Sequence, residues 1–329
     1  MIVVILGVTA IVFFWLINLY FSSVWDKKLS ISLDVDKSIV SEGDTLVLTE
    51  TITNDKMMVI PSIEIKYNVP ASFQFADNQS VSTGDNAYRK DNFALLGKKR
   101  ISRTYAFKAS KRGYYHLTGF DVVARDYLAK KKYIRRAANE SELCVLPKPT
   151  DCGDFIPLYD VIRKNAEYKN INIILDGNTV INRSRAELQE HLISIVSSIG
   201  NMILTEGYGL SVYSNYKLNN DMYLSLHGLK GLGELEKLNK CLASINTSSD
   251  TRAITETVEK SVNPEDKETA TILISANRLE TIEKFKADML KKNIELYTAL
   301  IYTKYEVKNI LKDKEASEDE RILLWEVDA

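Results

Sequence analysis

An uncharged apolar run at residues 2–21 restricts this chain more than any other feature of its sequence. Within the run only Thr9 and Asn18 are strongly polar. Twenty helical residues at about 1.5 Å each extend roughly 30 Å, which is the thickness of a bilayer's hydrocarbon core. Tyr20 and Trp25 lie near one end, where aromatic side chains favour the lipid headgroup level. The run therefore predicts a transmembrane helix.

A cleaved secretory signal is the alternative interpretation of this run. Such a signal has basic residues before its core, a shorter apolar core and small residues at its cleavage site. Here no Lys or Arg precedes the core, the core is longer, and residues 21–25 (Phe-Ser-Ser-Val-Trp) form a poor cleavage site. We therefore expect a retained anchor over residues 1–25. The first basic residues, Lys27 and Lys28, follow the span, so the positive-inside rule places the soluble body in the cytoplasm.

Composition restricts the rest of the chain to a few classes. More than 300 residues follow the anchor, which is enough for two domains with their own cores. The formal net charge of −1 gives no overall field that would attract nucleic acid. Three cysteines, Cys144, Cys152 and Cys241, cannot all pair and have no Cys-x-x-Cys spacing. This argues against a disulfide framework or a zinc site and favours a reducing compartment.

Residues 30–147 have the pattern of an antiparallel β-sandwich. Apolar and polar residues alternate with a period of two, and turn signals such as Glu42-Gly-Asp44 and Asn54-Asp55 interrupt the alternation. Short strands without helices between them are typical of sandwiches. The expected strands include 45–53, 60–69, 100–109, 113–117, 120–125 and 142–146.

The pattern changes after a proline-rich stretch, and we expect a linker over residues 148–169. From residue 170 to residue 329, strands alternate with helices, which predicts a doubly wound α/β domain with a mostly parallel sheet. The expected strands are 171–175, 210–213, 222–226, 269–275, 294–302 and 322–327. The expected helices are 184–207, 232–245, 253–262, 281–292 and 307–313.

Ligands of such sheets bind beyond the carboxyl ends of the strands. The first strand ends in Asp176-Gly-Asn-Thr-Val180, which resembles the start of the cation site of von Willebrand A domains. The resemblance implies Asp176, Asn178 and Thr251 as ligands of a divalent cation such as Mg²⁺, which prefers oxygen ligands. Val180 has no oxygen, and Asn277 stands near the expected second aspartate. We therefore expect a degenerate site that holds no cofactor, with Asp176 as a turn and helix-entry residue.

A second resemblance extends over most of the soluble body. Residues 42–54, 111–121, 123–128 and 145–149 are similar, in that order, to motifs of the domain-of-unknown-function family fifty-eight, with Arg112-Gly113 the most specific. Members of this family join a membrane segment, a β-sandwich and a von Willebrand A-like domain. They are encoded beside MoxR-type AAA+ ATPases and membrane-bound transglutaminase-like proteins. Here Tyr127 replaces the family's proline, an Arg-x-Ile-x-Trp stretch does not follow Asp154, and one span replaces the membrane hairpin of many members.

Catalytic motifs are not recognisable in the sequence. The three histidines, His116, His191 and His227, have no nucleophile elbow beside them, and no Walker-type loop occurs. The glycines of residues 228–233 fit a turn better than a phosphate site. We expect that the protein is not an enzyme.

One basic cluster has two interpretations. Lys130, Lys131, Lys132, Arg135 and Arg136 form either a solvated loop or a contact with anionic lipid headgroups near the anchor. Nucleic-acid binding is not expected, because the net charge is near zero and no aromatic stacking platform is evident.

Together these features predict a single-pass, membrane-tethered scaffold or adaptor that is not an enzyme. Its degenerate von Willebrand A-like domain would dock a protein partner, which the family resemblance implies to be a MoxR-type ATPase, with neighbouring membrane proteins. The alternative is an exported, cation-dependent ligand-binding or adhesion module. The expected docking loops contain Asp176, Gly177, Asn178, Thr179, Thr251, Ser275 and Asn277.

Overall fold

The computed structural model describes residues 1–77, 81–83, 86–177, 183–303 and 319–327. The chain divides into two compact units, Met1–Val145 and Leu146–Ala329. Apolar side chains form one buried cluster in the first unit and two in the second. Each unit therefore has its own core.

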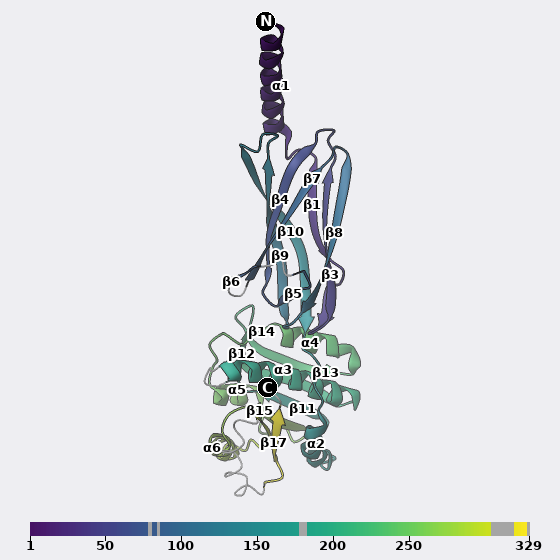
Figure 1. Cartoon of the computed structure of the whole chain (residues 1–329). Helices are drawn as coiled ribbons and strands as arrows, with labels where there is room; N and C mark the ends of the chain where they lie inside the picture. The colour runs from purple at the N-terminus through teal and green to yellow at the C-terminus, as the bar shows by residue number, and fades with distance from the viewer. Residues whose placement is uncertain (78–80, 84–85, 178–182, 304–318, 328–329) are drawn as a thin grey trace. The chain divides into compact units, whose positions relative to one another are not determined.

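The first unit begins with helix α1, Ile2–Val24. Among the described residues it is the one helix long and apolar enough to cross a membrane. Most of its side chains are exposed. In Figure 1 the helix is the purple ribbon that extends away from the strands. Its last turn differs, because Phe21 is fully buried in the core of the unit and Trp25 is 7% exposed.

Two mainly antiparallel sheets form the sandwich that the sequence predicted for residues 30–147. The four-stranded sheet has the order β1-β3-β8-β5, and the six-stranded sheet has the order β2-β10-β9-β4-β7-β6. Inward-facing residues of both sheets make up the core cluster. The strands are β1 (Leu29–Val35), β2 (Ile39–Ser41), β3 (Thr45–Asn54), β4 (Ile60–Pro70), β5 (Phe73–Phe75), β6 (Val81–Thr83), β7 (Asn86–Leu95), β8 (Lys99–Ala109), β9 (Gly113–Arg125) and β10 (Lys132–Leu146).

Strands β7, β9 and β10 of the sandwich differ from the expectation, and β1, β2, β5 and β6 were not among the expected strands. Strand β7 was not predicted, since its inward-facing positions include the charged Arg89 and Asp91. Strand β9 joins the expected strands 113–117 and 120–125 through Gly119, whose φ is +149°. A Cβ at that position would lie 2.6 Å from the Ala137 carbonyl oxygen, so glycine permits this close approach. Strand β10 begins at Lys132, well before the expected residue 142.

The expected linker over residues 148–169 contains two helical elements of the second unit. These are η1, Gly153–Phe155, and α2, Ile156–Arg163. Their apolar side chains belong to the core of that unit. The buried residues are Phe155, Leu158, Tyr159 and Ile162.

The second unit contains a mostly parallel sheet in the order β13-β12-β11-β15-β16-β17. Strand β11 lies at the centre, with β12 and β15 parallel to it on either side. Strand β13 runs antiparallel to β12 at one edge, and β14 also pairs with β12. The strands are β11 (Asn170–Leu175), β12 (Gly209–Leu218), β13 (Tyr223–Lys230), β14 (Ile245–Asn246), β15 (Thr269–Ser275), β16 (Tyr297–Thr303) and β17 (Ile322–Val327).

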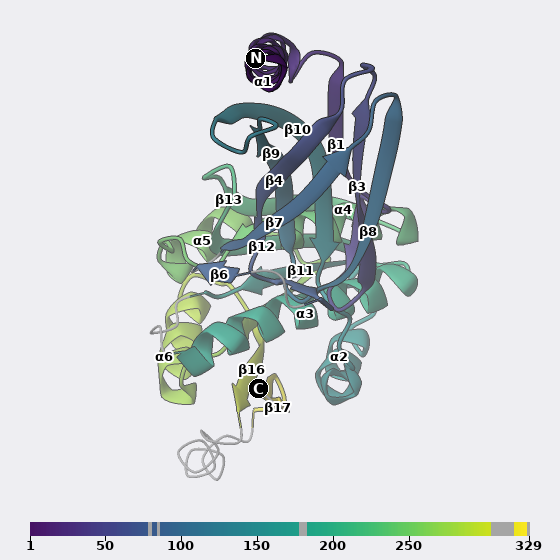
Figure 2. The same cartoon turned by 45° about the horizontal axis from the view of Figure 1, so that its top comes forward.

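Helices cover both faces of this sheet (Figure 2). Ile173 of β11 packs in one apolar cluster with α2, α3 and α4, whereas its neighbour Ile174 packs in the other with α5 and α6. This alternation follows from the period of two along a strand. The α/β alternation that the sequence predicted is therefore present; the expected helix 307–313 lies outside the described residues. The helical elements are α3 (Arg183–Thr205), η2 (Leu232–Glu234), α4 (Leu235–Ala243), α5 (Ile254–Ser261) and α6 (Leu279–Leu290).

Candidate functional site

Asp176 lies at the carboxyl end of the central strand β11. Its backbone N–H continues the sheet by donating to the Ile274 carbonyl oxygen at 2.9 Å. The residue has no exposed surface. The strand order therefore places this carboxylate between the ends of β12 and β15, where α/β sheets bind ligands.

Neutral donors surround the Asp176 carboxylate. Its Oδ2 accepts from Ser275 Oγ at 2.8 Å and from Asn277 Nδ2 at 2.6 Å, and its Oδ1 accepts from Asn215 Nδ2 at 3.2 Å. A divalent cation needs the same oxygen lone pairs, and carboxylates to offset its charge. An amide N–H has no lone pair to offer a cation. The arrangement holds a buried carboxylate by hydrogen bonds from its neighbours.

Asn215, which the sequence analysis missed, organises this site. It is fully buried on β12, and its Oδ1 accepts from the Gly177 backbone N–H at 2.7 Å. Its Nδ2 also reaches the Arg252 carbonyl oxygen at 3.3 Å, and its own carbonyl oxygen accepts from the Arg252 N–H at 3.3 Å. One side chain thereby joins the ends of three segments. The available signal was a buried-strand pattern interrupted by Ser214-Asn215.

Gly177 must be glycine in this arrangement. A Cβ there would lie 2.4 Å from the ring of Tyr216, which is closer than carbon atoms can approach. The chain therefore leaves β11 flat against an aromatic ring of β12. This contact fixes the direction of the backbone directly after Asp176.

The structure brings part of the predicted docking set together. Asp176, Gly177, Ser275 and Asn277 are linked by direct hydrogen bonds or through Asn215, whereas Asn178 and Thr179 lie outside the described residues. Ser275 was expected in a docking loop. It is fully buried, so its hydroxyl faces the interior and is not available to a partner.

Thr251 is half-buried beside Arg252. The Arg252 guanidinium lies 4.4 Å from the Tyr223 ring centroid, and its Nε donates to Thr257 Oγ1 at 2.8 Å. Arg252 thus fixes this loop to strand β13 and helix α5. The half-buried Asn277 and the exposed Arg278 complete the accessible rim.

The basic cluster is divided between a turn and a strand. Lys130 and Lys131 lie in the β9–β10 turn, where Asp126 Oδ1 accepts their backbone N–H groups at 2.8 and 3.3 Å. Lys132, Arg135 and Arg136 belong to β10, so the prediction that these three residues lie in a loop is wrong. Arg135 has a structural contact, because its guanidinium donates to the carbonyl oxygens of Asp26 and Leu29 at 3.1 and 3.3 Å.

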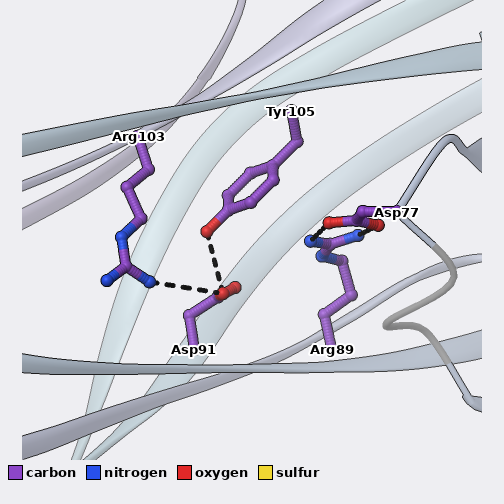
Figure 3. A network of polar contacts seen from close by, with 5 residues as sticks. All are labelled: Asp77, Arg89, Asp91, Arg103 and Tyr105. Atoms are coloured by element: carbon purple, nitrogen blue, oxygen red, sulfur yellow. Dashed lines mark hydrogen bonds and ion pairs between the residues drawn. The ribbon is translucent and has the colours of Figure 1, made fainter.

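A buried polar network lies within the sandwich (Figure 3). Arg89, 1% exposed, donates two hydrogen bonds to Asp77 at 2.9 and 2.7 Å. Its guanidinium lies 4.2 Å from the Phe75 ring centroid and 4.4 Å from that of Tyr105. The Tyr105 hydroxyl donates to Asp91 at 2.8 Å. The charge of Arg89 is thus offset by a fork-shaped ion pair and by two aromatic faces.

Glu50 extends this network into the core. It has no exposed surface, and neither carboxyl oxygen has a hydrogen-bond partner among the described residues. Burial, and after it the nearby Asp91 carboxylate, raises the pKa of Glu50 to about 8. Burial also raises the pKa of the Tyr67 hydroxyl on the facing sheet. The network therefore holds Glu50 as a neutral acid at pH 7.

The histidines and cysteines do not gather at Asp176. His227 lies in β13, with Nδ1 3.0 Å from the Tyr213 hydroxyl and Nε2 2.8 Å from Ser225 Oγ. His116 Nδ1 lies 3.3 Å from Glu142 Oε1 on the sandwich surface, and His191 is half-buried on α3. Burial raises the pKa of the Cys152 thiol to about 11. Among the described residues, no three His, Cys, Asp or Glu side chains are placed to share a metal ion.

Comparisons with known proteins add only distant similarities in structure. No protein-family model matches the sequence, and no curated protein matches it. A CARDB domain from Pyrococcus furiosus, solved with di-metal ions, has 12% identity and a TM-score of 0.23 over 36% of this chain and 93% of its own. A non-cellulosomal cohesin from Archaeoglobus fulgidus has 8% identity and a TM-score of 0.24 over 42% and 99%. A cohesin from Acetivibrio cellulolyticus, solved with a dockerin, has 12% identity and a TM-score of 0.24 over 35% and 99%.

Proposed function

We propose that this protein is a membrane-tethered adaptor whose α/β unit docks a protein partner without a divalent cation and without catalysis. The observation that carries the proposal is the set of neutral donors on Asp176, with Asn277 Nδ2 at 2.6 Å. A cation at this position would have to displace those donors. The rim around them is left as a surface for contact.

The fold of the second unit supports a von Willebrand A-like assignment. Its sheet has the order β13-β12-β11-β15-β16-β17, with β13 antiparallel at one edge and β14 paired with β12. The acidic residue at the end of the first strand fits the same resemblance. The proposed partner, a MoxR-type AAA+ ATPase, rests on the similarity of the sequence to the domain-of-unknown-function family fifty-eight.

The packing of α1 supports a retained anchor over a cleaved signal. Phe21 belongs to the sandwich core, and its ring centroid lies 5.6 Å from those of Tyr127 and Tyr133. Cleavage after this residue would remove a buried aromatic side chain from a folded domain. We propose that the body faces the cytoplasm, in line with Lys27 and Lys28 directly after the span.

Co-purification from detergent-solubilised membranes tests the adaptor role. The tagged full chain is recovered with the ATPase present, in nucleotide-bound and nucleotide-free conditions. Arg278→Glu reverses the charge of an exposed residue on the rim, and Lys164→Glu makes the same change at the C-terminal end of α2. We expect recovery of the ATPase to be lost with Arg278→Glu and retained with Lys164→Glu. Recovery of no ATPase in either nucleotide state would contradict the proposed partner.

A further inference from the structure

Three turns of the sandwich meet where α1 enters it (Figure 1). The Asp55 N–H donates to the Lys28 carbonyl oxygen, and the Lys98 N–H donates to the Lys56 carbonyl oxygen, both at 2.9 Å. The Tyr127 hydroxyl donates to the Val59 carbonyl oxygen at 2.8 Å. Residues 55–59, 96–98 and 126–131 therefore form one continuous surface around the end of α1, here called the anchor end.

Large apolar side chains are exposed on each turn of the anchor end. Met57 is 81% exposed, Leu96 60% and Leu128 51%. In the described part of the sandwich, the one other large apolar side chain more than half exposed is Ile134, which lies on β10 close to the same hairpin. Exposed apolar side chains on adjoining loops mark an interaction surface.

Lysines accompany these apolar side chains. The two packed turns carry Lys56 and Lys98, and the hairpin carries Lys130 and Lys131. The Asp126 carboxylate of the hairpin is buried and accepts backbone N–H groups, which leaves Asp26 and Asp55 as the acidic side chains with exposed surface near these turns, fewer than the lysines. Further lysines at this end are Lys27, Lys28, Lys99 and Lys132.

A groove of about 450 Å³ separates the hairpin from α1. Ile11, Phe14 and Trp15 line it on the helix, and Leu128, Lys130 and Lys131 line it on the hairpin. Phe14 lies about two helical turns before the buried Phe21, so the hairpin reaches back alongside the apolar run. An apolar wall with lysines opposite it has the chemistry of a phospholipid that carries a negative charge.

We propose that the anchor end docks onto an anionic lipid surface. Met57, Leu96 and Leu128 enter the boundary between headgroups and acyl chains, and the lysines contact lipid phosphates. Part of one lipid occupies the groove between α1 and the hairpin. The inference rests on the proposed membrane anchor, because a membrane-spanning α1 brings these turns to the bilayer. Docking would restrain the sandwich that the anchor alone leaves free to tilt.

Fluorescence in nanodiscs tests the docking. The full chain is incorporated into phosphatidylcholine discs with and without phosphatidylglycerol. A polarity-sensitive dye is attached to Met57→Cys or Leu128→Cys, and to Tyr114→Cys at the start of β9 as the control. The unsubstituted chain measures the background from the native cysteines. A charge variant, Lys130→Gln with Lys131→Gln, is compared with Lys108→Gln and Lys111→Gln near the β8–β9 turn.

We expect the emission at positions 57 and 128 to shift to the blue in discs that contain phosphatidylglycerol. The shift should shrink with Lys130→Gln and Lys131→Gln, or at high salt, and should persist with the matched control. Emission equal to that at position 114 in both kinds of disc would overturn the docking while leaving the anchor intact. An equal shift in pure phosphatidylcholine would overturn the role of anionic lipid. Failure of the chain to enter discs would contradict the anchor and the docking together.

Discussion

Asn277 Nδ2 donates a 2.6 Å hydrogen bond to the Asp176 carboxylate, across the ends of the neighbouring strands β15 and β11. An amide supplies a hydrogen to the carboxylate, whereas an acid would supply a second negative charge that only a cation or proton could offset. The Asn277 amide thus completes an internal hydrogen-bond network at a place where an acid would favour a cation. The adaptor proposal depends on this network.

Changing Asn277 to Asp should make the Asp176 site bind a divalent cation. Two carboxylates at hydrogen-bond distance repel each other, so Asn277→Asp should lower the melting temperature in a chelating buffer. Millimolar Mg²⁺ should then raise it, because a ligand at about 100 times its Kd stabilises the folded state by about 2.7 kcal/mol. Thermal unfolding with and without Mg²⁺ measures both effects.

The control for that change is Asn201→Asp, at an exposed position of α3. Neither the control nor the unsubstituted chain should respond to Mg²⁺. An equal rise in the melting temperature of the unsubstituted chain would mean that its site already binds the cation.

Replacing Asn215 should destabilise the second unit. Asn215→Ala leaves the Gly177 N–H and the Asp176 carboxylate short of partners in a buried place. Each such loss costs about 1–3 kcal/mol. Denaturant unfolding should show a lower free energy of unfolding, whereas Asn220→Ala in the exposed β12–β13 turn should have an effect below about 0.5 kcal/mol. Equal effects would argue against Asn215 as the organiser of the site.

The buried Glu50 predicts a pH dependence of stability. Its pKa rises from 4.5 to about 8 on folding, so its favourable contribution is complete below pH 4.5 and is lost as the pH rises through about 8. The neutral Glu50→Gln should unfold at a higher temperature than the unsubstituted chain at pH 8, and the difference should narrow towards pH 4.5. A difference that does not change with pH would contradict a protonated Glu50.

Phe21 joins the anchor to the sandwich. Phe21→Ala removes a fully buried ring and should lower the free energy of unfolding of the sandwich by about 3–5 kcal/mol, as for other buried phenylalanines. Phe13→Ala in the exposed part of α1 is the matched control and should leave unfolding of the sandwich unchanged. If Phe21→Ala has no effect on denaturant unfolding in detergent, α1 and the sandwich are independent, and the argument against signal cleavage fails.

Periodicity predicted much of the fold, because most strands are buried either on both faces or on alternate residues. Strand β11 is buried on both faces and mostly apolar, and β4 alternates, so local pattern and final environment agree. Periodicity did not predict β7, because Arg89 and Asp91 occupy inward positions there, and charged residues normally indicate a solvent-exposed face. It failed again for α2, whose apolar face follows closely spaced prolines that suggested a linker.

The site was predictable only where the order of strands determines it. Asp176 and Asn277 end neighbouring strands, so a parallel sheet brings them together. Asn215 gave no comparable signal, because its role depends on contacts with three separated segments. The lysines of the anchor end could not be predicted as a group either, because they come from turns that are distant in sequence.

Calorimetric titration of the purified full chain with Mg²⁺, Ca²⁺ and Mn²⁺ tests whether the Asp176 site binds a divalent cation. Asp176→Asn, which keeps the shape of the side chain and removes its charge, is titrated in parallel. We expect no saturable binding that differs between the two proteins. Saturable one-to-one binding that Asp176→Asn abolishes would contradict this expectation and favour the cation-dependent ligand-binding module instead.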